Sequence, residues 1–113
     1  MYLKNSKIVA VKIGSSLLID DNMKIRTKWL IEFSKDIKKL VDQGKKVIII
    51  TSGAIALGCK KLNLKKINLK LDKSQAVASI GQIELMNLFK KNFNKVKLNL
   101  SQILLTLEDT EQR

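Results

Sequence analysis

The chain has 113 residues and a formal net charge of +12, with no histidine and one cysteine. A chain of this length buries enough surface for one hydrophobic core, which predicts a single domain. The lone cysteine excludes an internal disulfide framework, and without histidine neither a zinc site nor a His-assisted nucleophile is expected. Since no apolar run approaches the roughly 18 residues of a membrane span, we expect a cytoplasmic protein with no membrane partner.

The positive charge comes mostly from lysine, because only Arg26 and Arg113 are arginines. Proline is absent, while lysine, isoleucine and asparagine are abundant, a composition that an AT-rich coding sequence produces regardless of function. The arginine and aromatic residues that read or stack bases are not interleaved with the lysines. We therefore expect no nucleic-acid partner, and a basic RNA- or DNA-binding module is the alternative from another functional class.

Apolar periodicity predicts the secondary structure along the chain. Two β-branched runs predict buried strands over residues 7–13 and 46–51. Between them an apolar stripe predicts a helix over about residues 23–43, and Gly44 stands where a helix C-terminal cap belongs. A short helix is predicted to open at residues 52–54 and to run to about residue 61, and a longer one, with Gly81 inside, is predicted over residues 74–93. Residues 63–71 predict a loop or an edge element, and residues 96–106 a third strand.

This order of elements indicates the fold class. Strand, helix, strand, helices and strand in succession predict parallel strands joined by right-handed crossovers. The fold is therefore expected to be α/β, an open, mostly parallel sheet with helices on both faces in a three-layer αβα arrangement. Ligands of such sheets bind beyond the carboxyl ends of the strands, so the candidate site residues follow the predicted strands.

The first strand ends in Lys12, Gly14, Ser15 and Ser16. Gly14 lets a ligand approach the backbone, and the two serines offer hydroxyl and N–H groups to phosphate oxygens. An unpaired lysine inside an apolar strand is costly to bury, which favours a functional role for Lys12. The alternative is a tight turn beside a lysine whose ammonium group reaches solvent.

The second strand leads into Ser52, Gly53 and Ala54 at the start of a predicted helix. A helix N-terminus suits a carboxylate or a phosphate, but serine is also a common helix N-cap, and both interpretations stay open. Glu108 and Asp109 follow the third predicted strand. They either assist a magnesium ion or solvate a loop, and we favour the loop.

Four segments, in this order, resemble the amino acid kinase family. They are residues 11–16 (VKIGSS), residues 51–58 (TSGAIALG), parts of residues 75–86 and residues 102–106 (QILLT) with Asp109 and Arg113. The first segment is similar across the family, whereas the second and third together resemble the branch that phosphorylates glutamate. Another branch, of the acetylglutamate kinase type, is the alternative among enzymes. The resemblance covers about residues 7–113.

The resemblance implies an ATP-dependent phosphotransferase with Mg²⁺ and ATP as co-substrates. The acceptor would be L-glutamate and the product γ-glutamyl phosphate, in the first step of proline biosynthesis. Lys12 would neutralise charge on the phosphoryl group in flight, and the phosphates would be lined by Gly14, Ser15 and Ser16. Ser52 would contact glutamate in a pocket shaped by Gly53 and Ala54. No residue is assigned to a metal, and the full-length form is expected to be a homo-oligomer.

Members of the family continue well past the stretch that this chain resembles. Residues 1–113 are therefore expected to be the N-terminal part of an amino acid kinase domain, without its C-terminal nucleotide-binding part. By themselves these residues are expected to be inactive, with a sheet edge left open.

Overall fold

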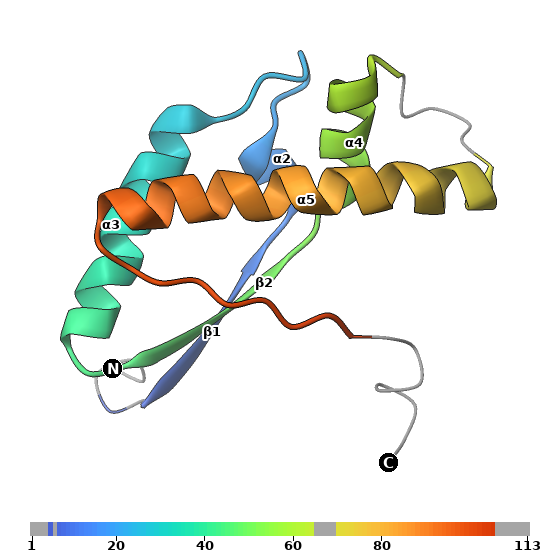
Figure 1. Ribbon diagram of the computed structural model, residues 1–113. Helices are drawn as coiled ribbons and strands as arrows, with labels where there is room; N and C mark the ends of the chain where they lie inside the picture. Colours follow the sequence, from blue (N-terminus) through green and yellow to red (C-terminus); the bar gives the residue numbers. More distant parts are fainter. Residues whose placement is uncertain (1–4, 6, 65–69, 106–113) are drawn as a thin grey trace.

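The computed structural model describes residues 5, 7–64 and 70–105, and two parallel strands and four helices follow one another within the last two of these ranges (Figure 1). The elements are, in chain order, β1 (Ile8–Ile13), α2 (Ser15–Leu18), α3 (Thr27–Asp42), β2 (Lys46–Thr51), α4 (Ala54–Leu62) and α5 (Leu71–Lys95). The two strands pair in parallel, with Ile8 opposite Lys46 and Ile13 opposite Thr51. Their carboxyl ends therefore leave the sheet at the same edge, where α2 and α4 begin. The α/β class and the parallel sheet are confirmed.

The sheet is covered on one face only within the described ranges. Val9 and Ile13 are buried on that face, whereas Ile8, Ile48 and Ile50 on the other are each more than half exposed. The two strands were expected to be buried throughout, and this part of the prediction is wrong. Side chains alternate across a strand, so covering one face hides only every second residue. The three-layer arrangement is thus incomplete in this part of the chain.

The hydrophobic core lies between the covered sheet face and the helices. The ring of Phe33 on α3 stacks on Phe93 of α5, with centroids 6.4 Å apart, and Trp29 stacks on Phe33 at 4.9 Å. Burying one leucine or phenylalanine side chain contributes about 1.5–3 kcal/mol, so the contact between Phe33 and Phe93 helps to hold α3 against α5. The most deeply buried apolar side chains come from β1 and from all four helices and include Ile13, Leu18, Leu30, Cys59, Leu85 and Phe89.

Helix α3 starts at Thr27, four residues later than predicted. Asp20 fixes the preceding residues in a turn, because its Oδ1 accepts hydrogen bonds from the backbone N–H groups of Asn22 and Lys24, both 2.9 Å long. Met23 has a φ of +62° there, outside the helical range. Side-chain bonds of this kind compete with helix formation.

The C-terminus of α3 confirms the predicted cap. Gly44 has a φ of +84°, and its N–H donates to the carbonyl of Val41 at 2.9 Å. The N–H of Lys45 donates to the carbonyl of Leu40 at 3.1 Å. These two bonds satisfy carbonyls that the helix end would otherwise leave unpaired, and glycine adopts the left-handed conformation at no steric cost.

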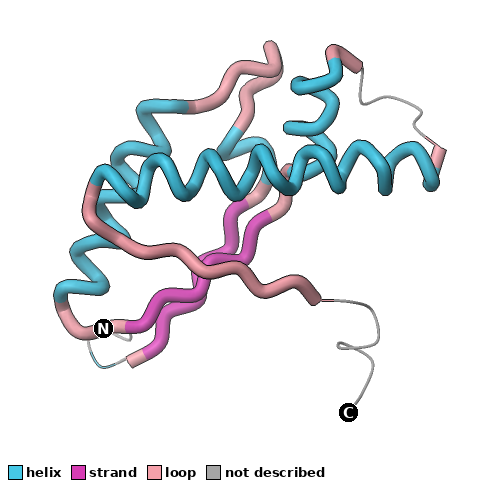
Figure 2. The backbone as a smooth tube through the Cα atoms, viewed as in Figure 1, coloured by secondary structure: helices cyan, strands magenta, loops and turns pink. Residues whose placement is uncertain are grey.

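The predicted third strand does not form among residues 96–105. This segment is a loop, drawn in pink after α5 in Figure 2, and Ile103, Leu104 and Leu105 are 82%, 69% and 71% exposed. An apolar run becomes a strand only when its backbone N–H and C=O groups pair with those of a neighbouring strand. This segment does not pair with β1 or β2. Thr106, Glu108 and Asp109, like residues 65–69 of the predicted loop, lie outside the described residues.

Helix α5 is longer than predicted, running over Leu71–Lys95. Helix α4 (Ala54–Leu62) begins at the last of the three residues predicted to open it, and its end and both strands match their predicted ranges to within one residue. Across the described ranges, no helix combines the length and hydrophobicity needed to cross a bilayer.

Candidate functional site

The ends of the two strands lie side by side. The backbone N–H of Ser52 donates to the carbonyl of Ile13, at 3.2 Å. Gly53 has a φ of +120°, and a Cβ placed on it would lie 3.5 Å from the Cβ of Ser15. The structure thereby brings together the two segments that the sequence singled out separately, as expected for parallel strands.

A cleft of about 410 Å³ opens where these segments meet. Its polar groups are the hydroxyls of Ser15, Thr51 and Ser52 and the side-chain amide of Gln82. The other lining residues are apolar or glycine, namely Gly53, Ala54, Ile55, Ala56, Ala78 and Leu85. Among the described residues that line it none is charged, so a ligand here is held by neutral donors and by shape.

The first turn of α4 faces the cleft without a capping side chain. Gly53 is the N-cap residue and no side-chain cap bond is made to the helix, which begins with the N–H of Leu57 donating to the Gly53 carbonyl at 2.9 Å. The interpretation of Ser52 as the N-cap is therefore wrong, since Ser52 precedes the cap. The N–H groups of the first helical turn have no intrahelical acceptor and suit a carboxylate or a phosphate.

Lys12 lies on the open face of β1, where it is exposed opposite Ile50 of β2. The expectation of a lysine buried in an apolar strand is wrong, because the alternation of β1 directs Lys12 away from the core. The cost of desolvation therefore gives no argument for its function. Lys12 remains two residues before Gly14, at the strand end that leads to the cleft.

Gly14 and Ser16 border the cleft without lining it. A Cβ on Gly14 would meet nothing within 4 Å, so open space lies beside this turn. Ser16 is exposed, and its carbonyl accepts a hydrogen bond from Arg26 Nε at 2.8 Å. Of the residues predicted for the site, the cleft gathers Ser15, Ser52, Gly53 and Ala54.

Helix α5 closes the cleft because two glycines let it touch α4. A methyl group on Gly81 would overlap the carbonyl oxygen of Ala54, and one on Gly58 would overlap that of Val77. The helices can approach this closely only while both positions lack a Cβ. Gln82, next to Gly81, is thereby brought into the wall of the cleft. Sequence reasoning gave it no role, although a glycine inside a long helix was a signal of close packing.

The described residues include no group of three or more acidic, cysteine or histidine side chains that could hold a metal ion. The carboxylate of Asp20 lies in the turn before α3 and is held by backbone hydrogen bonds. Hydrogen bonds from the backbone, first that of Lys24 and then that of Asn22, hold the pKa of this carboxyl below its usual value.

Comparison with known proteins identifies the family to which the sequence is similar. The sequence pattern of the amino acid kinase family matches residues 7–113. Over 113 residues the chain is 74% identical to the glutamate 5-kinase of Pelagibacter ubique, with 100% of this chain and 31% of that relative covered. It is 45% identical over 114 residues to the glutamate 5-kinase of Nitrobacter hamburgensis, covering 100% of this chain and 30% of the relative.

The glutamate 5-kinase of Bradyrhizobium diazoefficiens is 41% identical over 112 residues, covering 98% of this chain and 30% of the relative. The chain spans about a third of the length of the curated relatives it matches. Because the family pattern extends over residues 7–113, nearly the whole of the sequence, this chain belongs to the amino acid kinase family.

Proposed function

We propose that this chain supplies the phosphate turn and the acceptor pocket of an ATP-dependent kinase that phosphorylates the γ-carboxylate of L-glutamate. The observation that carries the proposal is the cleft in which Ser15 of α2 meets Ser52, Gly53 and Ala54 at the start of α4. The named activity of the 74%-identical relative supports the choice of acceptor.

The proposed reaction needs no covalent enzyme intermediate. An oxygen of the ionised γ-carboxylate attacks the γ-phosphorus of ATP, and the bond from that phosphorus to the β,γ-bridging oxygen breaks. ADP leaves with that oxygen and its electron pair, and the product is γ-glutamyl phosphate. Because the carboxylate is already ionised at neutral pH, no general base is required, which agrees with the absence of histidine. Phosphoryl transfer depends mainly on positioning and on electrostatic stabilisation.

Each candidate residue has a role in this proposal. Ser15 and the Gly14 and Ser16 backbone groups would line the phosphates, and Ser52 would contact glutamate in the pocket shaped by Gly53 and Ala54. Lys12, with its flexible side chain at the end of β1, would reach the transferring phosphoryl group and neutralise its charge. Mg²⁺ would enter with ATP as part of that substrate. The cleft offers it no carboxylate, so we assign no described residue to it.

A chimera tests the proposal directly. Residues 1–113 replace the matching stretch of the Pelagibacter ubique relative, and ADP release is measured with L-glutamate or N-acetylglutamate as acceptor. We expect release that depends on L-glutamate, and the unaltered relative serves as the control. A chimera that folds, as shown by circular dichroism, yet releases no ADP with glutamate would overturn the proposal. Preference for N-acetylglutamate would assign the chain to the other branch instead.

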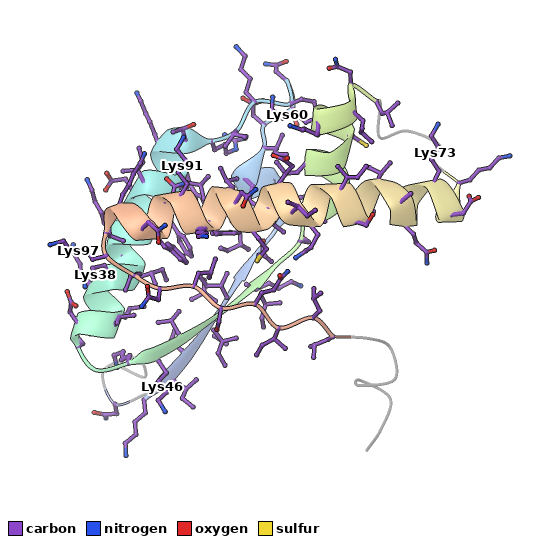
Figure 3. The ribbon with its side chains drawn as sticks, in the orientation of Figure 1. Lys38, Lys46, Lys60, Lys73, Lys91 and Lys97 are labelled. Carbon is purple, nitrogen blue, oxygen red and sulfur yellow. The ribbon has the colours of Figure 1, made fainter. Side chains whose placement is uncertain are left out.

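The alternative of a nucleic-acid-binding module receives little support from the distribution of charge. Figure 3 labels six lysines, and they extend outward around the molecule from different elements. They are Lys38 on α3, Lys46 on β2, Lys60 on α4, Lys73 and Lys91 on α5, and Lys97 after α5. A single basic patch would instead gather them on one face. A salt-dependent shift assay with single-stranded and duplex oligonucleotides separates the two functions.

The proposal extends to the context of the activity. We propose that the full-length form is a cytoplasmic homo-oligomer that catalyses the first step of proline biosynthesis. Residues 1–113 would be the N-terminal part of its kinase domain.

A further inference from the structure

Gln82 holds a position in the cleft that the proposed roles leave unexplained. Among the described residues that line the cleft it is the one with a side-chain amide, it comes from α5, and it is half-buried. Its amide makes no hydrogen bond to another described residue, so its donors and acceptor remain available to a ligand. A polar group kept in a cleft by tight helix packing, and left without a protein partner, is suited to bind a substrate.

The two ends of the cleft differ, and this difference indicates how a substrate would be oriented in it. At one end Gly53 lies against Ser15, which belongs to the phosphate turn. At the other end Ala54 lies against Gly81, and Gln82 follows Gly81 on α5. The transferring phosphoryl group must be on the side of Ser15, so the reacting γ-carboxylate points there. The opposite, non-reacting end of the substrate then lies toward Gln82.

We propose that Gln82 is a specificity-determining residue that binds the α-carboxylate of the amino acid acceptor through its side-chain N–H₂ group. This inference rests on the proposed function. The amide can donate two hydrogen bonds to a carboxylate and carries no charge that would attract free phosphate. Bonds to a charged group are stronger than bonds between neutral groups, so one such contact discriminates well between acceptors.

The test uses the chimera defined above with Gln82→Met, which keeps the length of the side chain and removes its donors. We expect the KM for glutamate to rise about tenfold or more, which corresponds to the loss of one hydrogen bond to a charged partner. The KM for ATP should change less than twofold. Gln82→Glu should raise the glutamate KM further, because a negative charge then faces the α-carboxylate. Asn87→Met, the same exchange of an exposed amide outside the cleft on the same helix, should leave both constants unchanged.

Two acceptor analogues identify the group that is bound. Glutarate keeps a carboxylate at the non-reacting end, whereas 4-aminobutanoate lacks the α-carboxylate. As competitive inhibitors, glutarate should bind the Gln82→Met variant about tenfold more weakly than the parent, and 4-aminobutanoate should bind both equally.

A glutamate KM within twofold of the parent, or an equal rise in the KM for ATP, would overturn the assignment of Gln82. An equal loss with both analogues would overturn the assignment to the α-carboxylate. Failure of the proposed function looks different, because the parent chimera would then show no glutamate-dependent activity before any substitution at Gln82.

Discussion

Gly81 of α5 packs on the backbone of Ala54 so closely that a methyl group in its place would overlap the Ala54 carbonyl oxygen. This contact joins two elements that line the cleft. Ala54 is the first residue of α4, and Gly81 on α5 comes directly before Gln82. The position of the site thus depends on a glycine that takes no part in binding. Helix propensity and packing oppose one another at this residue, and the outcome can be measured.

We expect Gly81→Ala to destabilise the chimera. Alanine is favoured over glycine in a helix by about 1 kcal/mol, but forcing a methyl group into backbone contact costs typically 1–3 kcal/mol and often more. The Ala54 carbonyl cannot move aside as a flexible side chain would, so we expect a net loss of about 2 kcal/mol. Thermal unfolding measures it. Gly14→Ala is the control, since its Cβ meets nothing within 4 Å and its φ is −77°. Stabilisation by Gly81→Ala would show that α4 and α5 lie farther apart.

Lys12→Ala should lower kcat while leaving stability nearly unchanged. Losing one electrostatic contact to the transition state costs about 3 kcal/mol, equivalent to more than a hundredfold in rate. The KM for glutamate should change much less. Because Lys12 is exposed, a fall in activity cannot be attributed to a damaged core. Lys46→Ala on the same open face is the matched control, at the other end of the ladder. If kcat for Lys12→Ala stays within threefold, this lysine only solvates the sheet.

Ser52→Ala should raise the KM for glutamate more than the KM for ATP. The sequence alone suggested that losing a serine cap would also cost about 1 kcal/mol of stability. The structure removes that expectation, because Gly53 is the N-cap and makes no side-chain cap bond. We therefore expect the free energy of unfolding to change no more than in a neutral surface substitution, by about 0.5 kcal/mol, with little shift in the melting temperature. A lower melting temperature with unchanged constants would return Ser52 to a structural role.

Asp20 should titrate below the usual range of an aspartate. The backbone N–H of Lys24, and next that of Asn22, donate to its ionised carboxylate and lower its pKa. A lowered pKa in the folded state adds stability above the unfolded-state value of about 3.9, and this contribution disappears as the pH falls through the lowered pKa. An NMR titration of the side-chain carboxyl carbon measures the shift directly. Asp20→Asn should weaken the acid dependence of the turn before α3, and a pKa at or above the usual value would contradict the hydrogen bonds.

Most of the fold could be predicted from local patterns. The strands β1 and β2 have β-branched runs, and Gly44 marks the end of α3 through a conformation that favours glycine. Helix α3 starts later than apolar periodicity predicts, because the hydrogen bonds that the Asp20 carboxylate accepts from the backbone leave no trace in that periodicity. The prediction of a third strand is wrong. Ile103, Leu104 and Leu105 have the composition of a strand, but a strand also needs a neighbouring strand to pair with, and composition does not reveal whether one is within reach.

The site could be predicted only in part. Ser15, Ser52, Gly53 and Ala54 follow strand ends, and the rule for parallel sheets places such residues together. The orientation of Lys12 could not be predicted, because it depends on which face of the sheet the helices cover. That choice is made by packing between elements that are distant in sequence. Gln82 comes from a helix that is remote in sequence, so only the contact between Gly81 and Ala54 reveals its place.

The last prediction concerns residues 1–113 by themselves. They offer phosphate the hydroxyls of Ser15 and Ser52, uncapped N–H groups and one exposed lysine, but the described residues lining the cleft hold no charged side chain. We expect ATP and inorganic triphosphate to bind equally weakly and to dissociate as the salt concentration is raised. None of the residues proposed for the site would recognise adenine. We also expect self-association, because Ile8, Ile48 and Ile50 are exposed on the open sheet face and both strand edges lack a described neighbour.

Calorimetry with the two ligands, and light scattering over a range of concentrations, measure these properties. Ile48→Thr with Ile50→Thr should reduce self-association without changing the affinity for triphosphate, because both side chains face away from the cleft and neither change adds a charge beside Lys12. Tight binding that prefers ATP, or ADP release that depends on glutamate, would mean that these 113 residues already hold an adenine site. The donor's phosphates and the acceptor would then be aligned by this part of the chain alone, which its neutral cleft argues against.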